Sequence, residues 1–118
     1  MTPKDLLIQT LNTIQPCVKL QGTYQEGEAY PNTFITFWTV DVPELQHHDD
    51  DVSSWEWNFQ VMNYSTNPET VEAQAEKIRT ELKAAGFIPQ GKGHDLLSDE
   101  PTHTGWAQDF KFIEYRIN

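Results

Sequence analysis

The chain has 118 residues, with 18 Asp and Glu against 8 Lys and Arg and a formal net charge of −10. A surface this acidic repels phosphate, which argues against sequence-specific DNA or RNA binding and against adhesion to anionic membranes. The length suits one domain, residues 1–118, with a single two-layer core.

Cys17 is the only cysteine, so no disulfide can form within the chain and a secreted disulfide scaffold is not indicated. Its neighbours Gln15, Pro16 and Val18 include no histidine, which favours a plain semi-buried thiol over a catalytic one. The longest uninterrupted apolar run is Leu6–Ile8, too short for a signal peptide or a membrane span. We therefore expect a soluble chain that works in a reducing compartment.

The first predicted element is a short helix. Thr2 at the cap, Pro3 at the first helical position and Asp5 three residues after the cap form a typical helix start. An apolar stripe of helical spacing follows, and the next proline stops it; the stripe consists of Leu6, Leu7, Leu11 and Ile14. Cys17–Tyr24 is then expected to form a short strand, followed by a Gly- and Glu-rich loop.

Two strands joined as a hairpin come next. Thr33–Val40 is β-branched and aromatic, and Ser54–Val61 alternates apolar with polar residues at period two, as a half-buried strand does. Between them, Glu44–Asp51 is too polar to bury. These segments predict a hairpin with a long, solvated, acidic tip.

A second, longer helix is predicted over Pro68–Ala85. Asn67 takes the cap position, and Gly86 ends the helix. Its apolar residues are spaced four and three apart, as one helix face requires; they are Val71, Ala75, Ile78, Leu82 and Ala85. This stripe predicts that the helix covers one face of the sheet.

The last third of the chain is expected to contain a brief strand at Phe87–Ile88, a long loop or small β-excursion over Gln90–Gly105, and a terminal strand over Trp106–Ile117. Apolar residues fall on both parities of the terminal strand. Either a bulge near Phe112 shifts the register, or both faces are buried in the second half of the strand.

These elements predict an α+β fold with a mostly antiparallel sheet of four to five strands and two helices, in the order α-β-β-β-α-(β)-β. Two helices cover only part of such a sheet, and the strand Thr33–Val40 also carries apolar residues on both faces. We therefore expect another subunit to cover part of the second face.

Three groups of residues raise the question of catalysis or metal binding. His47 and His48 beside Asp49–Asp51 offer donor atoms for Zn²⁺ or Ca²⁺, but adjacent loop residues point apart and no metal-site spacing is present. Gly91–Asp95 lacks the order of a phosphate-binding loop, and Ser98 has triad partners in composition only. We expect no enzyme activity, no catalytic residue, no metal and no cofactor.

Three segments carry a resemblance to a known family. They are Thr36–Trp38, Ala85–Phe87, and Gly91–Asp95 followed by Ser98–Gly105 (Ser-Asp-Glu-Pro-Thr-His-Thr-Gly). Together with the order of the predicted elements, they resemble the small tail-terminator (tail-completion) proteins of long-tailed bacteriophages and of prophages of Gram-positive bacteria. The similarity spans nearly the whole chain, and Ser98–Gly105 is its most specific part.

The resemblance implies an assembly role. Such proteins cap the growing tail tube, commonly as a hexameric ring, fix its length and present a surface that joins the tail to the head. The implied partners are other copies of the chain, the tail-tube protein and a head-completion or connector protein. The implied location is the host cytoplasm during assembly and then the virion, at the tail–head junction. No site residue is carried over, because none of these motifs has an assigned catalytic role.

The candidate lumen or interface residues come from the acidic tip and from the two strands with apolar residues on both parities. They are Asp49, Asp50, Asp51, Glu44, Phe34, Trp38, Phe110 and Tyr115.

Two alternatives from other classes stay open. The charge also suits an acidic nucleic-acid mimic that inhibits a host DNA-binding protein or nuclease. The second alternative is a small metal-dependent enzyme built on His47, His48, His94 and His103, which elemental analysis would detect.

Overall fold

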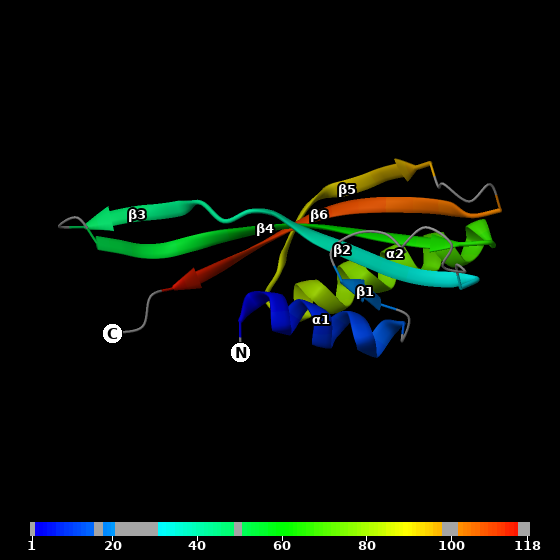
Figure 1. Ribbon diagram of the computed structural model, residues 1–118, viewed down its shortest axis with the longest axis horizontal. Coiled ribbons are helices and arrows are strands. Elements are labelled where there is room, and N and C mark those ends of the chain that lie inside the picture. Colours follow the sequence, from blue (N-terminus) through cyan, green and yellow to red (C-terminus); the bar gives the residue numbers. More distant parts are fainter. Residues whose placement is uncertain (1, 16–17, 21–30, 49–50, 98–101, 116–118) are drawn as a thin grey trace.

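The computed structural model describes residues 2–15, 18–20, 31–48, 51–97 and 102–115; for residues 18–20, 46–48 and 51–53 it describes the backbone course. The elements are α1 (Pro3–Ile14), β1 (Val18–Leu20), β2 (Thr33–Asp41), β3 (Glu44–His48), β4 (Asp51–Ser65), α2 (Pro68–Ala84), β5 (Ile88–Leu96) and β6 (Thr104–Tyr115). Figure 1 shows both helices on one side of a twisted sheet. The predicted α+β class, with two helices and a mostly antiparallel sheet, is confirmed.

The sheet is built around β4, its longest strand. The strand order is β1-β2-β4-β6-β5, with β3 also paired to β4, and the described sheet has six strands. All the pairs are antiparallel except β1 with β2. β4 pairs with β6 from Ser54↔Tyr115 to Ser65↔Thr104 without a register shift, so this pair forms an unbroken spine.

β2 and β3 are successive halves of one long partner for β4. The register shifts between Thr39 and Asp41, and Pro43 lies between the two strands, where its missing N–H costs no ladder bond. The Glu56 N–H donates to the Pro43 carbonyl at 2.9 Å, which holds the crossing against β4.

The predicted loop Glu44–Asp51 is wrong over most of its length. Residues Glu44–His48 form β3, and Asp51 already belongs to β4. Polar side chains do not prevent strand pairing, because a hairpin satisfies backbone N–H and C=O groups whether or not the side chains are buried. Asp49 and Asp50 lie outside the described residues.

The predicted long loop Gln90–Gly105 is also largely a strand, as the alternative of a β-excursion anticipated. β5 runs antiparallel to β6 over Ile88–Leu96, and its register shifts between Gln90 and His94. Gly91 and Gly93 have φ values of 70° and 99°, so they form a bulge within the strand. The bulge sits on β5. Of the two alternatives for β6, the register shift near Phe112 is absent from the β4–β6 ladder.

Both helices begin and end as their sequences predict. The Thr2 hydroxyl accepts from the Asp5 N–H at 3.1 Å, and the Asp5 carboxylate accepts from the Thr2 N–H at 3.2 Å. In α2 the Asn67 side chain accepts from the Glu69 N–H at 3.0 Å. Gly86, at φ 103°, then ends α2, since this backbone conformation is unfavourable for other residues.

The main core lies between the helices and one face of the sheet. α1 contributes Leu7 and Leu11, and α2 contributes Ile78 and Leu82. The sheet and the segment after α2 contribute Ile35, Phe37, Phe59, Val61, Phe110 and Phe87. The helical stripe predicted from the sequence is therefore the buried face of α2.

A second cluster lies on the opposite face of the sheet. It consists of Phe34, Met62, Tyr64 and Ala107, with Leu96 packed against it. The rings of Phe34 and Tyr64 stack with centroids 4.9 Å apart. Part of the second apolar face is therefore buried within one chain. From the sequence pattern, we expected another subunit to cover it.

The molecule is long and narrow, with extents of 54 × 29 × 23 Å. At one end, which we call the arm, the ribbon extends beyond both helices (Figure 1). The arm consists of β3, residues 51–56 of β4 and residues 113–115 of β6. The remainder, with the helices and both clusters, is called the body.

Candidate functional site

The structure divides the candidate residues from the sequence into three groups. Phe34 and Phe110 are 2% and 1% exposed, so their side chains are core residues, which corrects their choice as interface candidates. Trp38 and Tyr115 are 48% and 71% exposed, and Glu44 is also exposed. The remaining three candidates are the acidic tip: Asp51 starts β4, and the other two lie outside the described residues.

The arm brings some of these residues together. Glu44 pairs with Trp55 across β3 and β4, and Tyr115 pairs with Ser54 across β4 and β6. Because Ser54 and Trp55 are consecutive, Glu44 and Tyr115 lie on opposite sides of one short stretch of β4. Trp38 lies in the body, opposite Gln60, whose side-chain oxygen accepts from the indole N–H at 3.0 Å.

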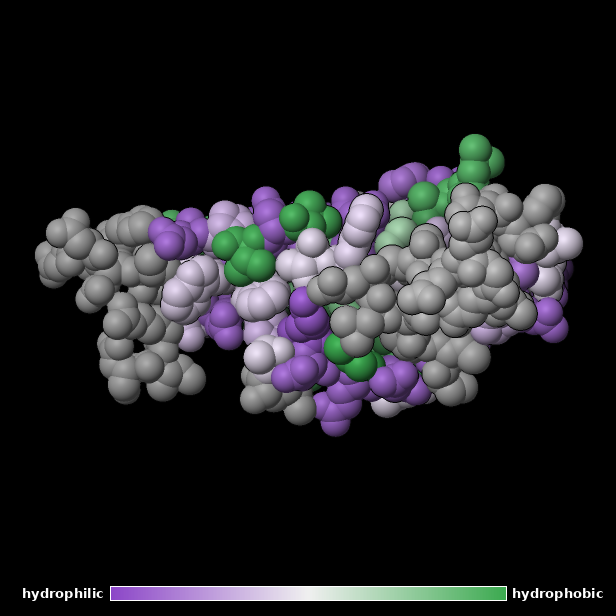
Figure 2. Space-filling model, viewed as in Figure 1, coloured by the Kyte–Doolittle hydropathy of each residue, from purple (hydrophilic) through white to green (hydrophobic). Residues whose placement is uncertain are grey.

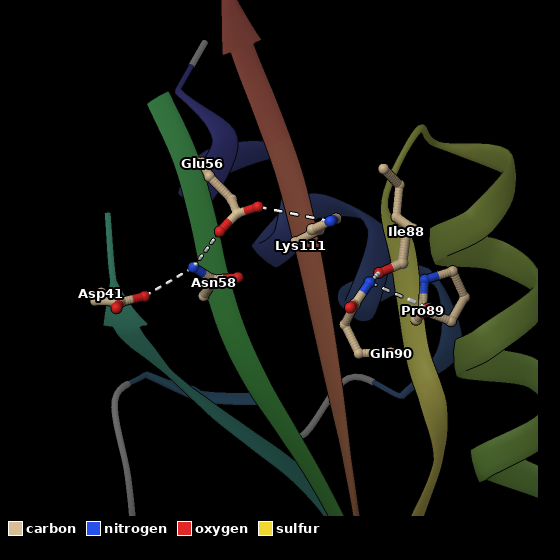
Figure 3. A network of polar contacts seen from close by, with 7 residues as sticks. All are labelled: Asp41, Glu56, Asn58, Ile88, Pro89, Gln90 and Lys111. Atoms are coloured by element: carbon tan, nitrogen blue, oxygen red, sulfur yellow. Dashed lines mark hydrogen bonds and ion pairs between the residues drawn. The ribbon is translucent and has the colours of Figure 1, made fainter. Parts of the chain in front are cut away.

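A polar network crosses the sheet where the arm meets the body (Figure 3). The Asn58 amide donates to Asp41 at 2.7 Å and to Glu56 at 3.1 Å. Lys111 forms an ion pair with Glu56 at 3.5 Å. These side chains come from β2, β4 and β6 and pair with one another. The network therefore links three neighbouring strands on the face of the sheet away from the helices.

Hydrophobic side chains reach the surface at separate places in the view of Figure 2, among hydrophilic ones. The exposed large apolar residues in the described chain are Trp38, Val40, Leu45, Ile88, Leu97 and Tyr115. Two of them, Leu45 and Tyr115, lie on the arm. Scattered apolar side chains are ordinary on protein surfaces, so they do not by themselves define a site.

The two histidine side chains that the structure describes, His94 and His103, do not converge on one site. His94 is exposed on β5, whereas His103 is buried, with Nε2 2.8 Å from the Pro31 carbonyl and Nδ1 3.1 Å from the Thr102 hydroxyl. In the described part of the chain, no group of three or more His, Cys, Asp and Glu side chains is arranged to hold a metal ion. The side chains of His47 and His48 lie outside that description.

The glycine motif Gly91–Asp95 forms the bulge of β5, and side chains from α2 and β6 hold its carbonyls. The Arg79 guanidinium donates to the Gly91 carbonyl at 2.6 Å, and the Trp106 indole N–H donates to the Lys92 carbonyl at 2.9 Å. The Gln108 amide donates to the carbonyls of Gln90 and Gly91 at 3.1 and 2.8 Å. The motif is therefore part of an edge strand whose carbonyls are held by side-chain hydrogen bonds.

Beside this bulge lies a groove of about 600 Å³ that the sequence did not reveal. Its walls are one face of α2 and the end of the sheet formed by β5 and β6. Val71, Ala75 and Trp106 give it an apolar floor, and Glu72, Asp95 and Lys92 bring charges to its rim. The sequence signal for this groove was the apolar spacing of three and four along α2. The same spacing also predicts the face of α2 that packs on the main core, so it did not point to a groove.

No helix among the described residues is long and apolar enough to cross a membrane. A scan against protein-family models finds no match, and a search among curated proteins finds none either.

Proposed function

We propose that this chain is a structural subunit of a phage neck, which forms a ring that caps the tail tube and joins the tail to the head. The observation that carries the proposal is the sequence resemblance, above all Ser98–Gly105, to small tail-terminator proteins. The proposed partners are further copies of the chain, the tail-tube protein and a head-completion or connector protein. The protein would act in the host cytoplasm and remain in the virion.

Two observations support this proposal. The arm carries exposed residues on paired strands beyond the helices, which suits contact with neighbouring proteins. The net charge of −10 also suits a subunit past which DNA moves, because an acidic lining repels phosphate and does not retain it.

Inactivating the gene in the phage or prophage that encodes the chain tests the proposal. We expect DNA-filled heads without attached tails, together with tail tubes of irregular length, seen by negative-stain electron microscopy. Wild-type protein supplied in trans should restore joined virions, and Leu82→Ala, which removes a fully buried side chain, should restore fewer. Normal joined virions in the absence of the gene would overturn the proposal.

The acidic charge also favours the second candidate, a nucleic-acid mimic that occupies the basic groove of a host protein. Affinity capture separates the two candidates. A neck subunit recovers tail-tube protein from a lysate of infected cells, whereas a mimic recovers one basic DNA-binding protein or nuclease from uninfected cells as well. Recovery of the second kind alone would favour the mimic.

A further inference from the structure

The two ends of the groove beside α2 carry opposite charges. The chain reverses at Gly86, so α2 and β5 run in opposite directions, and the start of α2 lies beside the end of β5 (Figure 1). The exposed carboxylates of Glu72 and Asp95 therefore lie toward one end of the groove. Arg79 and Lys92 lie toward the other end, at the bulge.

An occupant of this groove needs two properties. The floor of Val71, Ala75 and Trp106 requires an apolar side chain, because leaving these surfaces in water forgoes about 25 cal/mol per Å² of burial. The carboxylates of Glu72 and Asp95 favour a basic side chain next to the apolar one, and they would repel an acidic one.

The end of β6 offers this combination. Tyr115 is 71% exposed at the tip of the strand, and the sequence continues Arg116, Ile117, Asn118. We infer that the segment Tyr115–Asn118 of a second copy docks in the groove, with Ile117 toward the apolar floor and Arg116 toward Glu72 and Asp95. This inference deepens the proposed function and rests on it, because it names the contact by which neck subunits join.

A chain cannot fill its own groove with this segment. Trp106 lines the groove, and Tyr115 lies nine residues further along the same strand, about 30 Å away at roughly 3.3 Å per residue. Ile117 is two residues past Tyr115 and reaches at most about 7 Å further. The contact must therefore form between copies.

The acidic tip of the hairpin is a second candidate occupant of the groove. Its run Asp49–Asp51 would bring like charges against Glu72 and Asp95, which costs affinity. Charge thus selects the end of β6 over the tip of the hairpin.

The contact joins two different surfaces at opposite ends of a 54 Å molecule. Such a head-to-tail contact repeats from copy to copy, and it produces a ring where the rotation closes. An isologous contact between arms would instead stop at a dimer.

Disulfide trapping in the full chain tests the inference. In a Cys17→Ser background, Ile117→Cys and Ala75→Cys place one thiol on the segment and one in the groove. Mild oxidation should produce a ladder of linked dimers, trimers and larger species on non-reducing gels. The matched control pairs Ile117→Cys with Lys77→Cys, an exposed position two residues along α2 and therefore on a different side of the helix.

The charges supply a second measurement. Arg116→Glu, added to the Ile117→Cys and Ala75→Cys protein, should lower the linked yield at least about tenfold, and further addition of Asp95→Lys should restore most of it. An absence of linked species above the control, both in free protein and on tail ends, would overturn the inference. A reduction by Arg116→Glu that Asp95→Lys fails to restore would overturn the proposed orientation.

The outcomes separate this inference from the proposed function. If no link forms but the protein still binds tail ends, the groove contact is wrong and the neck role stands. If the ladder forms and tail ends are not bound, the contact stands and the neck role is wrong.

Discussion

The body and the arm share one continuous sheet but differ in what covers it. In the body, helices bury one face over the main core, and the second cluster buries much of the other. In the arm, the same strand β4 continues with Trp55 and Glu56 half-buried, beyond the reach of the helices (Figure 1). Backbone pairing thus continues into the arm, where no helix covers the strands.

The largest expected difference between the two regions is in free energy of unfolding. Leu82→Ala in the body removes a fully buried side chain and should cost about 2–5 kcal/mol through lost burial and a cavity. Leu45→Ala in the arm removes a side chain that is 43% exposed and should change stability by no more than about 0.5 kcal/mol. Urea denaturation of both variants measures the contrast. Equal costs would mean that the arm is as well packed as the body.

The bulge of β5 gives a second contrast at the edge of the body. A Cβ at Gly93 would overlap the Ala107 carbonyl oxygen, and the φ of this residue is 99°, so Gly93→Ala should cost about 2–4 kcal/mol. A Cβ at Gly91 meets nothing within 4 Å, and its φ of 70° leaves only the conformational penalty of about 1–2 kcal/mol. Thermal unfolding should rank the two variants in this order. A reversed rank would contradict the described bulge.

Self-association is expected to be opposed by the acidic tip of the arm. Replacing Asp49, Asp50 and Asp51 by Asn should strengthen association at low salt and flatten its salt dependence, because salt screens like charges over about 8–10 Å near physiological strength. Sedimentation velocity over a salt series measures both effects. Replacing Glu69 and Glu81 by Gln and Asp109 by Asn removes the same number of exposed charges from the body, outside the groove, as a control. If neither protein associates at any salt concentration, and tail ends bind neither, the proposed ring subunit is wrong and the nucleic-acid mimic is favoured.

The smallest expected effect is the pH dependence of the α1 cap. The hydrogen bond from the Thr2 backbone N–H lowers the pKa of Asp5 below its ordinary value of 3.8. A lowered pKa in the folded state stabilises the fold above the ordinary pKa, and this stabilisation is lost as the pH falls through the folded pKa. Asp5→Asn should therefore be less stable than the wild type near neutral pH, with the gap closing in acid. A gap that widened in acid would contradict this assignment, and Glu81→Gln serves as the uncapped control.

Local chemistry made both helices predictable from the sequence. The Thr2 and Asn67 caps and the glycine after α2 act within a few residues of themselves, and each occurs as expected. The apolar stripe of α2 was likewise readable, since helical spacing puts Val71, Ile78 and Leu82 on one side.

The candidate site was only partly predictable. Trp38 and Tyr115 are exposed, as an interface requires. Phe34 and Phe110 come from the same two strands with apolar residues on both faces, but they are buried. Alternation along a strand tells which residues share a face, and it does not tell whether that face is covered at a given point along the strand.

The sequence by itself determined the acidic charge, the two helices, the hairpin and the α+β class, because these follow from composition and from contacts between residues close in the chain. Tertiary structure alone decided that β5 pairs with β6 through a bulge, since Arg79, Trp106 and Gln108 hold its carbonyls from distant parts of the chain. It alone also produced the groove beside α2 and the arm. Both depend on where the helices end relative to the strands, which no local pattern encodes.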